Sequence, residues 1–215
     1  MNVAELIGPT APLEVRAIAA TTLFGSLTRH GTSAALGNTT DTALLHAVRH
    51  WADCVLVGAG TVRAEGYGSS STPLAVVTRS LDLDTASPLF DGAVHVLTPQ
   101  HSLDDVTLAT KRNQLLRAGA RLVSTGDGTA AQILAALRSL GHRRISCEGG
   151  PSLYAEMFRA DAIDVLHLTV DPTLSGADGH PGLPLTGDDV RRFTLEDVSV
   201  DRDSTLFCRY RRARS

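Results

Sequence analysis

Short apolar runs alternate with helical patterns along most of the chain, and this alternation constrains the fold more than any other feature. Each run is bounded by glycine, proline or small polar residues, as strands of an α/β domain are. We expect strands at Val15–Leu23, Cys54–Gly58, Leu74–Thr78, Ala93–Thr98, Arg121–Ser124, Arg144–Cys147 and Val165–Val170. Helices are expected from Asn38, Thr39 or Thr40 to Trp51, over Leu103–Ala118 and Thr129–Leu140, and from Pro151 onward. Strands joined by helices pair in parallel, so the pattern predicts a mostly parallel sheet.

The end of the chain departs from this alternation. Two further strand-like runs, Phe193–Val200 and Ser204–Arg211, follow a loop from Asp171 to Gly187 and are joined only by Asp201–Asp203. So short a connection predicts an antiparallel hairpin. A chain of 215 residues with 43% hydrophobic content and no visible linker fits a single domain over residues 1–215, in which about the first 13 residues are an extension. We therefore predict one α/β domain with a mixed sheet.

Charge and composition narrow the class of protein. The net charge of −3 combines 20 basic and 23 acidic residues, so neither a nucleic acid nor a membrane surface is expected as a partner. No apolar run reaches the ~20 residues of a membrane span, and no secretory signal is visible, so we expect a cytoplasmic protein. The three cysteines, Cys54, Cys147 and Cys208, lie in apolar sequence and are expected to be buried thiols. The final arginines from Arg209 to Arg214 are expected to form a solvated tail.

The segment from Ile145 to Leu153 has the pattern of an anion site. A short strand ends in Glu148, two glycines follow, and Pro151 opens a helix. Glycines let a ligand approach the backbone, and a helix N-terminus presents unpaired N–H groups at the positive end of its dipole. Glu148 then lies beside the ligand, at the strand end where open α/β sheets bind their ligands. The alternative is an ordinary turn between a strand and a helix.

A second glycine-rich loop, Gly58 to Gly68, follows another strand. It begins like a dinucleotide-binding fingerprint, but Arg63 occupies the place of the third glycine. The glycines, serines and Pro73 that follow leave no room for the roughly ten-residue crossover helix of a standard dinucleotide unit, so we expect no helix there. Arg79, after the next strand, is a candidate for contact with a 2′-phosphate.

Together the two motifs resemble the C-terminal reductase domain of the RibD family. They are Cys54-Val-Leu-Val-Gly-Ala-Gly-Thr-Val-Arg-Ala-Glu-Gly-Tyr-Gly68 and Cys147-Glu-Gly-Gly-Pro-Ser-Leu153, in the order that this family has them. The likeness implies a dihydrofolate-reductase-like α/β/α fold with three layers. It also implies an NADPH-dependent enzyme of riboflavin biosynthesis that reduces a phosphoribosylamino-pyrimidine. No zinc deaminase pattern is present, so a stand-alone reductase is expected.

The resemblance also implies a set of site residues. Expected substrate contacts are Ser33, Arg49, Glu65 and Glu148, where Arg49 would grip the phosphate and Glu148 would be the catalytic residue. Expected cofactor contacts are Gly58, Ala59, Gly60, Thr61, Val62, Thr78, Arg79, Ser80, Gly149, Gly150, Pro151, Ser152 and Leu153. No metal is expected, and His46 and His50 are interpreted as exposed residues on one helical face. The resemblance further implies a homodimer with the terminal strands near its interface.

Two departures from the family pattern bear on the substrate. Phe24 stands where relatives usually have an acid, and Ser69 to Thr72 hold no basic residue where relatives commonly have an arginine. Three hypotheses therefore remain: the phosphoribosylamino-pyrimidine reductase, a reductase of a dihydrofolate, pterin or other small molecule in the same fold, and a non-catalytic nucleotide-binding paralogue.

Overall fold

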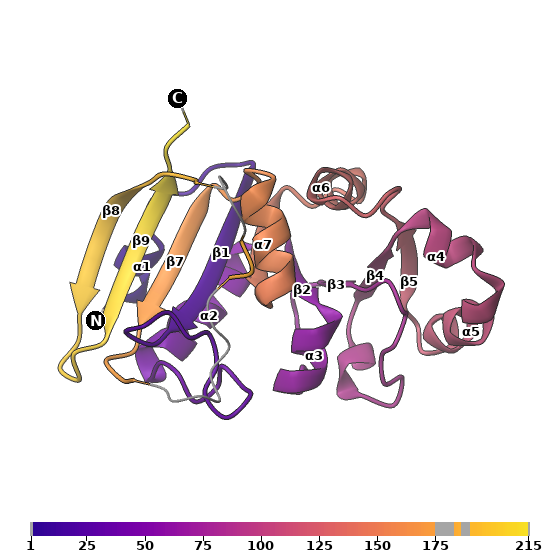
Figure 1. The fold of residues 1–215 in the computed structure, drawn as a ribbon, viewed down its shortest axis with the longest axis horizontal. Helices are drawn as coiled ribbons and strands as arrows, with labels where there is room; N and C mark the ends of the chain where they lie inside the picture. Colours follow the sequence, from indigo (N-terminus) through magenta and orange to yellow (C-terminus); the bar gives the residue numbers. More distant parts are fainter. Residues whose placement is uncertain (1, 175–182, 186–189, 215) are drawn as a thin grey trace.

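The computed structural model describes residues 2–174, 183–185 and 190–214. Within these residues one continuous sheet has the strand order β5-β4-β3-β2-β6-β1-β7-β9-β8 (Figure 1). The strands are β1 Glu14–Thr21, β2 Cys54–Gly58, β3 Leu74–Val77, β4 Val94–Thr98, β5 Arg121–Ser124, β6 Arg144–Gly149, β7 Val165–Val170, β8 Phe193–Val200 and β9 Leu206–Arg212. Neighbours from β5 to β7 pair in parallel, whereas β9 is antiparallel to both β7 and β8. The predicted mixed sheet with an antiparallel terminal hairpin is confirmed.

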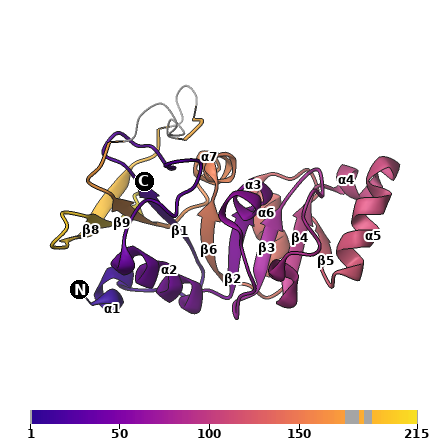
Figure 2. The same ribbon diagram turned by 90° about the horizontal axis from the view of Figure 1, so that it is seen from below.

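Helices cover both faces of this sheet. Figure 2 shows α1 and α2 on one side and α7 on the other. The helices are α1 Val3–Ile7, α2 Thr39–Trp51, α3 Ala59–Glu65, α4 Gln100–Asp104, α5 Ala109–Arg117, α6 Ala130–Ser139 and α7 Pro151–Arg159, with 3-10 turns at Pro88–Asp91 and Val106–Leu108. The described part of the chain thus has the three layers that the resemblance implied. None of its helices combines the length and the apolar character that crossing a membrane requires.

The central strand β2 is buried on both faces, which explains its unbroken apolar sequence. Cys54 and Leu56 pack toward α6 and α7, while Val55 and Val57 pack toward α3 and α5. All four side chains are fully buried. A strand in the middle of a parallel sheet carries such a run because helices cover both of its faces. Burial of one large side chain such as Leu56 contributes about 1.5–3 kcal/mol, so the centre of the sheet is a rigid base for the loops that leave it.

Two sequence-based expectations about helices were wrong. The glycine loop after β2 does form a helix, α3, but it has only seven residues and ends at Gly66, which takes a left-handed conformation with φ 62°. The segment is too short for a ten-residue crossover helix but long enough for these two turns. The long helix expected over Leu103–Ala118 is broken, because the chain leaves α4 at Asp105, whose side chain caps a 3-10 turn before α5 begins.

The terminal arginines are not a solvated tail. Arg209, Arg211 and Arg212 belong to β9, and only Arg214 lies beyond it. Each pairs with carboxylates that are distant in the sequence: Glu196 for Arg209, Glu14 and Glu196 for Arg211, Asp161 for Arg212, and Asp161 and Asp164 for Arg214. Arg209 also donates to the backbone oxygens of Glu5 and Leu6, which fixes α1 against the sheet. The three cysteines are buried, as predicted.

Candidate active site

The two glycine motifs lie side by side at the carboxyl ends of neighbouring strands. Strands β2 and β6 are paired in parallel, and Val57 is in register with Gly149. The chain enters α3 after Gly58 and α7 after Gly150. The backbone N–H of Gly150 donates to Thr61 Oγ1 at 3.0 Å, so residues about ninety positions apart are joined directly. This is the edge of a parallel sheet at which ligands are expected.

The motif Cys147–Leu153 requires glycine at position 149 and has little room for a side chain at position 150. Gly149 has φ 68°, and a Cβ atom there would lie 2.1 Å from the ring of Tyr154. A Cβ on Gly150 would lie 2.3 Å from Thr61 Oγ1. Pro151 follows at the first turn of α7, as predicted. The peptide bond between the two glycines is cis.

One cavity at this edge, here called the arginine cavity, collects most of the residues expected to bind a cofactor. It is lined by Gly58, Ala59, Gly60, Arg63, Val77, Thr78, Arg79, Ser80, Pro99, Thr125, Gly128, Ile133, Ser152, Leu153 and Glu156. Arg79 is exposed, and Arg63 donates to the backbone oxygen of Asp82. Two guanidinium groups against the single carboxylate of Glu156 make this cavity electropositive, which suits an anionic ligand.

The remaining residues expected to bind the cofactor lie elsewhere. Thr61, Gly150 and Pro151 line the neighbouring cavity, at its boundary with the first. Val62 is buried in the core cluster around β3 and lines neither cavity. Gly149 is also buried, beneath the turn that precedes α7.

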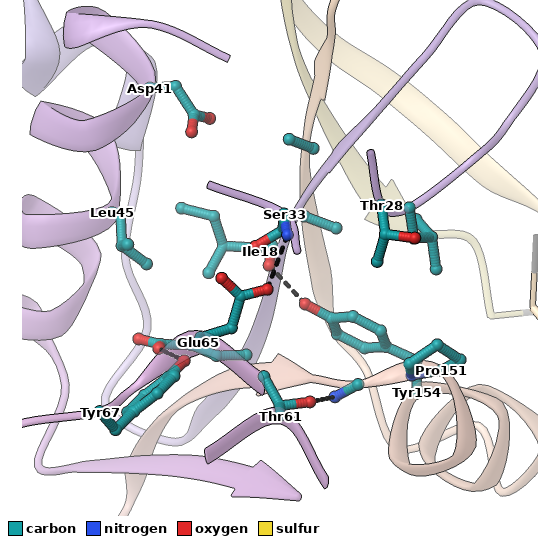
Figure 3. A pocket seen from close by; sticks show the side chains of 15 residues that line it. Ile18, Thr28, Ser33, Asp41, Leu45, Thr61, Glu65, Tyr67, Pro151 and Tyr154 are labelled. Atoms are coloured by element: carbon teal, nitrogen blue, oxygen red, sulfur yellow. Dashed lines mark hydrogen bonds between the residues drawn. The ribbon is translucent and has the colours of Figure 1, made fainter. Parts of the chain in front are cut away.

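The neighbouring cavity, here called the acidic cavity, collects the residues expected to bind substrate. It comprises two hollows that share Ser33, Asp41, Leu45, Glu65 and Tyr67. Glu148 lines one hollow and Arg49 the other. Figure 3 shows this cavity between α2, α3, α7 and the loop that carries Thr28 and Ser33. All four predicted substrate residues are therefore brought together.

Glu148 is held by three hydrogen bonds. Its side chain is only 3% exposed, and its two carboxylate oxygens accept from Arg49 Nε and Nη2, both at 2.6 Å. The hydroxyl of Tyr67 donates to Oε2 at 2.5 Å, and the Arg49 guanidinium lies over the Tyr67 ring at 5.2 Å. Burial lowers the pKa of Arg49, but the hydrogen bonds and charge of Glu148 outweigh it and raise that pKa above its ordinary value. Burial and the adjacent Glu148 charge raise the pKa of Tyr67.

Glu65 organises the loop that covers the cavity. At the end of α3, its carboxylate accepts from Thr32 Oγ1 at 2.5 Å and from the backbone N–H of Ser33 at 2.6 Å. Figure 3 shows Glu65 directed toward Ser33. The predicted pair Ser33 and Glu65 thus form one unit, in which the acid fixes the loop.

Two polar residues of this cavity, Tyr67 and Asp41, were not predicted from the sequence. Tyr67 lies in the motif Cys54–Gly68 but was not singled out, although a tyrosine among small loop residues is a visible signal. Asp41 lies in the first turn of α2, where an acid is ordinary because it complements the helix dipole. Its contact with Thr169 on β7 joins positions 128 residues apart and has no sequence signal.

The positions that depart from the family pattern carry no charge into the site. Phe24 is 88% exposed next to the turn at Gly25. Ser69 and Ser70 line the acidic cavity beside Arg49, and Thr72 Oγ1 donates to the backbone oxygen of Arg49. Among the residues that the structure describes, no group of three or more potential metal ligands is close enough to hold an ion.

Comparison with known proteins agrees with this architecture. A pyrimidine reductase-like protein from Corynebacterium diphtheriae is 30% identical, with a TM-score of 0.82 over 94% of this chain and 93% of that one. The riboflavin biosynthesis reductase of Saccharomyces cerevisiae is 18% identical, with a TM-score of 0.70 over 95% of this chain and 92% of that one. Dihydrofolate reductase from Enterococcus faecalis, solved with NADP(H), is 15% identical, with a TM-score of 0.55 over 94% and 97% of the two chains.

The dihydrofolate-reductase-like fold implied by the resemblance is thus confirmed. No curated protein matches the chain at a significant level. Residues 14–207 match the family profile of the RibD C-terminal domain, which covers both glycine motifs and both cavities. The chain belongs to the RibD C-terminal domain family.

Proposed function

We propose that this protein is an NADPH-dependent reductase of a phosphoribosylamino-pyrimidine in riboflavin biosynthesis, as the sequence led us to expect. The observation that carries the proposal is the meeting of two cavities of opposite charge at the β2 and β6 strand ends. The arginine cavity suits a phosphorylated cofactor, and the acidic cavity offers carboxylates and hydroxyls to a heterocycle. Thr61 and Gly150, bonded to one another, form the boundary at which cofactor and substrate would meet.

The residues of the arginine cavity fit a dinucleotide phosphate. A side chain on Gly58 would approach the backbone oxygen of Gly149 at 3.4 Å, while Gly60 faces open space in which a ligand can approach its backbone. The first turn of α7 presents the N–H groups of Ser152 and Leu153, which have no acceptor within the helix. Thr78, Arg79 and Ser80 would hold the adenosine ribose phosphate, and Arg79 would favour NADPH over NADH. The bound cofactor would supply the hydride.

The acidic cavity would hold the ring-opened form of the substrate, in which the ribosylamino group is an imine. Reduction adds a hydride to the imine carbon and a proton to its nitrogen, which gives a ribitylamino product and the oxidised cofactor. We propose that Glu148, fixed by Arg49 and Tyr67, orients the pyrimidine and relays a proton from solvent to the imine nitrogen. Ser33 and Glu65 would complete the substrate contacts. Positioning of the reactants would supply most of the rate.

A second candidate is a reductase of a dihydrofolate or pterin in the same fold. It is favoured by one observation. Among the described residues that line the acidic cavity, the only arginine already pairs with Glu148. The sequence-based role of Arg49 as a phosphate grip is therefore the weakest part of the first candidate. Both candidates share the cofactor, the hydride transfer and Glu148.

We also propose a homodimer formed through the terminal strands. On the face that carries α7, Leu166 of β7 packs against the core cluster that includes α7, and the apolar side chains of β8 lie farther out along the sheet, beyond this helix (Figure 1). The side chains on this face are Leu166, Leu168, Val170, Leu195, Val198, Val200, Leu206, Cys208 and Tyr210. Val198 and Val200 are 50% and 59% exposed. An apolar surface of this kind marks an interface, so Val198→Lys should convert the dimer into a monomer in light-scattering measurements, and an unchanged mass would refute the interface.

Cofactor binding and turnover test the enzymatic proposal in sequence. We expect NADPH fluorescence to increase on binding, with NADH bound more weakly, and we expect NADPH oxidation when the ribosylamino-pyrimidine is added. Glu148→Gln should lower turnover by roughly 10²–10⁴-fold while NADPH still binds. His50→Ala, an exposed change on the same helix as Arg49, is the matched control and should behave as the wild type. Binding without turnover of any substrate offered would support the non-catalytic paralogue instead.

A further inference from the structure

The phosphate of the proposed substrate needs a cation that the walls of the acidic cavity do not supply. A phosphate monoester carries about −1.5 to −2 charges near neutral pH. The described residues that line the cavity contribute the carboxylates of Asp41, Glu65 and Glu148 and a single guanidinium, that of Arg49. Both Nε and Nη2 of Arg49 donate to Glu148, so a phosphate there would have to break a bidentate pair. The cation must therefore come from beside the cavity.

The two hollows of the acidic cavity divide the substrate between them. The first hollow contains Thr61 and Gly150, which form the boundary with the cofactor, so the imine belongs there. The phosphate is at the far end of the ribose chain and falls into the second hollow, which lacks both residues of that boundary. Ser69 and Ser70 line this second hollow and offer hydroxyl groups but no charge.

Arg29 lies against the loop that forms one wall of the second hollow. Its Nη2 donates to the backbone oxygen of Ala35, and the residues on either side of Ala35, which are Ala34 and Leu36, line the hollow. Its Nη1 donates to Thr173 Oγ1 at 3.4 Å, which is a long contact. Both acceptors are neutral oxygens, and an arginine in a protein is always charged. Arg29 can therefore exchange these acceptors for an anion.

A tight hairpin holds the backbone of Arg29 in this place. The N–H of Arg29 donates to the backbone oxygen of Thr32 at 2.9 Å, and the two residues between them have positive φ. Thr32 Oγ1 and the N–H of Ser33 donate to Glu65, which ties the hairpin to the end of α3 (Figure 3). The guanidinium thus starts from a fixed backbone, and only the side chain has to move to reach a phosphate.

We propose that Arg29 binds the phosphate of the substrate in the second hollow, together with the hydroxyls of Ser69 and Ser70. This proposal rests on the proposed reductase function and names the residue that selects a phosphorylated substrate. A hydrogen bond from a guanidinium to a phosphate is about twice as strong as one between neutral groups, which favours the exchange of acceptors. Ser70 Oγ accepts from the N–H of Thr72, which leaves its hydroxyl proton to donate to the phosphate.

A matched pair of substrates tests the role of Arg29. The phosphoribosylamino-pyrimidine and its phosphate-free form are offered to the NADPH-saturated protein, and kcat/KM is measured for each. Arg29→Gln keeps an N–H donor for the Ala35 oxygen but removes the charge. It should lower kcat/KM for the phosphorylated form by roughly 10–100-fold and leave that for the phosphate-free form unchanged. Arg29→Lys, which restores a charge, should recover part of this loss.

Arg112 provides the matched control for this substitution. It also donates to two neutral oxygens, those of the Ser102 and Asp105 backbone, and it lines neither cavity. Arg112→Gln should therefore behave as the wild type with both substrates. Equal losses for the two substrates in Arg29→Gln would show that Arg29 only holds the loop, and no loss for either would exclude it. Each of these results would overturn the proposal and leave the reductase function standing.

A binding measurement separates failure of the proposal from failure of the function. Ribose 5-phosphate is titrated by calorimetry into the protein loaded with NADPH, so that the arginine cavity is already filled. Arg29→Gln should weaken this binding at least about tenfold with NADPH affinity unchanged, and ribose alone should not distinguish the two proteins. Equal binding of ribose 5-phosphate to the wild type and to Arg29→Gln would overturn the proposal. Binding that depends on Arg29, without reduction of either substrate, would support the proposal and refute the enzyme.

Discussion

The pair of Arg49 and Glu148 allows a quantitative test of how the acidic cavity is held together. Both contacts are 2.6 Å, and the two side chains are 23% and 3% exposed. Opposite charges about 4 Å apart attract by about 4 kcal/mol at an effective dielectric constant of 20. Removal of one partner of a buried pair costs about 3–5 kcal/mol, because the other charge is left uncompensated. For Arg49→Met we use the lower end of this range of about 3–5 kcal/mol, since water can reach the exposed part of the Arg49 side chain.

A double-mutant cycle isolates the interaction from the loss of each side chain. We expect Arg49→Met to lower the free energy of unfolding by about 3 kcal/mol, which corresponds to a decrease in Tm of about 6–12 °C for a chain of this size. Glu148→Gln should cost about 2 kcal/mol, since Tyr67 can still donate to the amide oxygen. The double variant removes both charges, so its loss should fall short of the sum of the single losses by about 2–3 kcal/mol.

The assay is urea unfolding of all four proteins, and the control is a second cycle on Glu156 and Arg159. That pair is 37% and 42% exposed, with a 3.4 Å contact between positions i and i+3, so its coupling should be about 0.2–0.5 kcal/mol. A coupling between Arg49 and Glu148 no larger than this control would refute the reasoning. Arg49 would then be free to grip a phosphate, as the sequence argument supposed.

Three further predictions concern cofactor choice, backbone conformation and pH. Arg79→Ala should raise the KM for NADPH roughly 10–100-fold and leave that for NADH unchanged in initial-rate assays; equal effects on both would remove Arg79 from the 2′-phosphate site. Gly149→Ala should lower the free energy of unfolding in urea by at least about 2 kcal/mol more than Gly141→Ala does. Both glycines have positive φ, but only at Gly149 would a side chain clash, in this case with Tyr154. Equal losses of stability would contradict this packing. Burial and the charges of the nearby arginines lower the pKa of His167 to about 3. As the pH drops from about 6.5 toward 3, His167 is protonated in the unfolded chain but not in the folded protein, so the free energy of unfolding falls. His167→Gln should remove about 2 kcal/mol of the stability lost between pH 7 and 5, and an unchanged loss would show that another group is responsible.

Local sequence signals predicted the sheet and both glycine motifs, because those features depend on neighbouring residues. The Asn38 cap, the apolar run of β2 and the glycines before α7 each follow from helix capping, burial on two faces or close packing of the backbone. The resemblance then located Ser33, Glu65 and Glu148 in one cavity.

The features that the sequence did not predict depend on contacts between distant parts of the chain. The terminal arginines resembled a solvated run because partners such as Glu14 lie at the other end of the sequence. Asp41 resembled an ordinary first-turn acid, and the pairing of Arg49 with Glu148 joins positions 99 residues apart. The helix α3 was not predicted because, at seven residues, it is shorter than a standard crossover helix. These are tertiary effects that composition and periodicity do not carry.

A hydride from NADPH should reach an imine in the acidic cavity, and analysis of the product reports on this transfer. The protein is incubated with NADPH and the ribosylamino-pyrimidine, and NADPH oxidation is followed together with mass spectrometry of the pyrimidine. We predict a ribitylamino product formed in step with NADPH oxidation, and its near-complete loss in Glu148→Gln. If NADPH binds but neither this substrate nor a dihydropterin is reduced, the account of the site as a reductase is wrong.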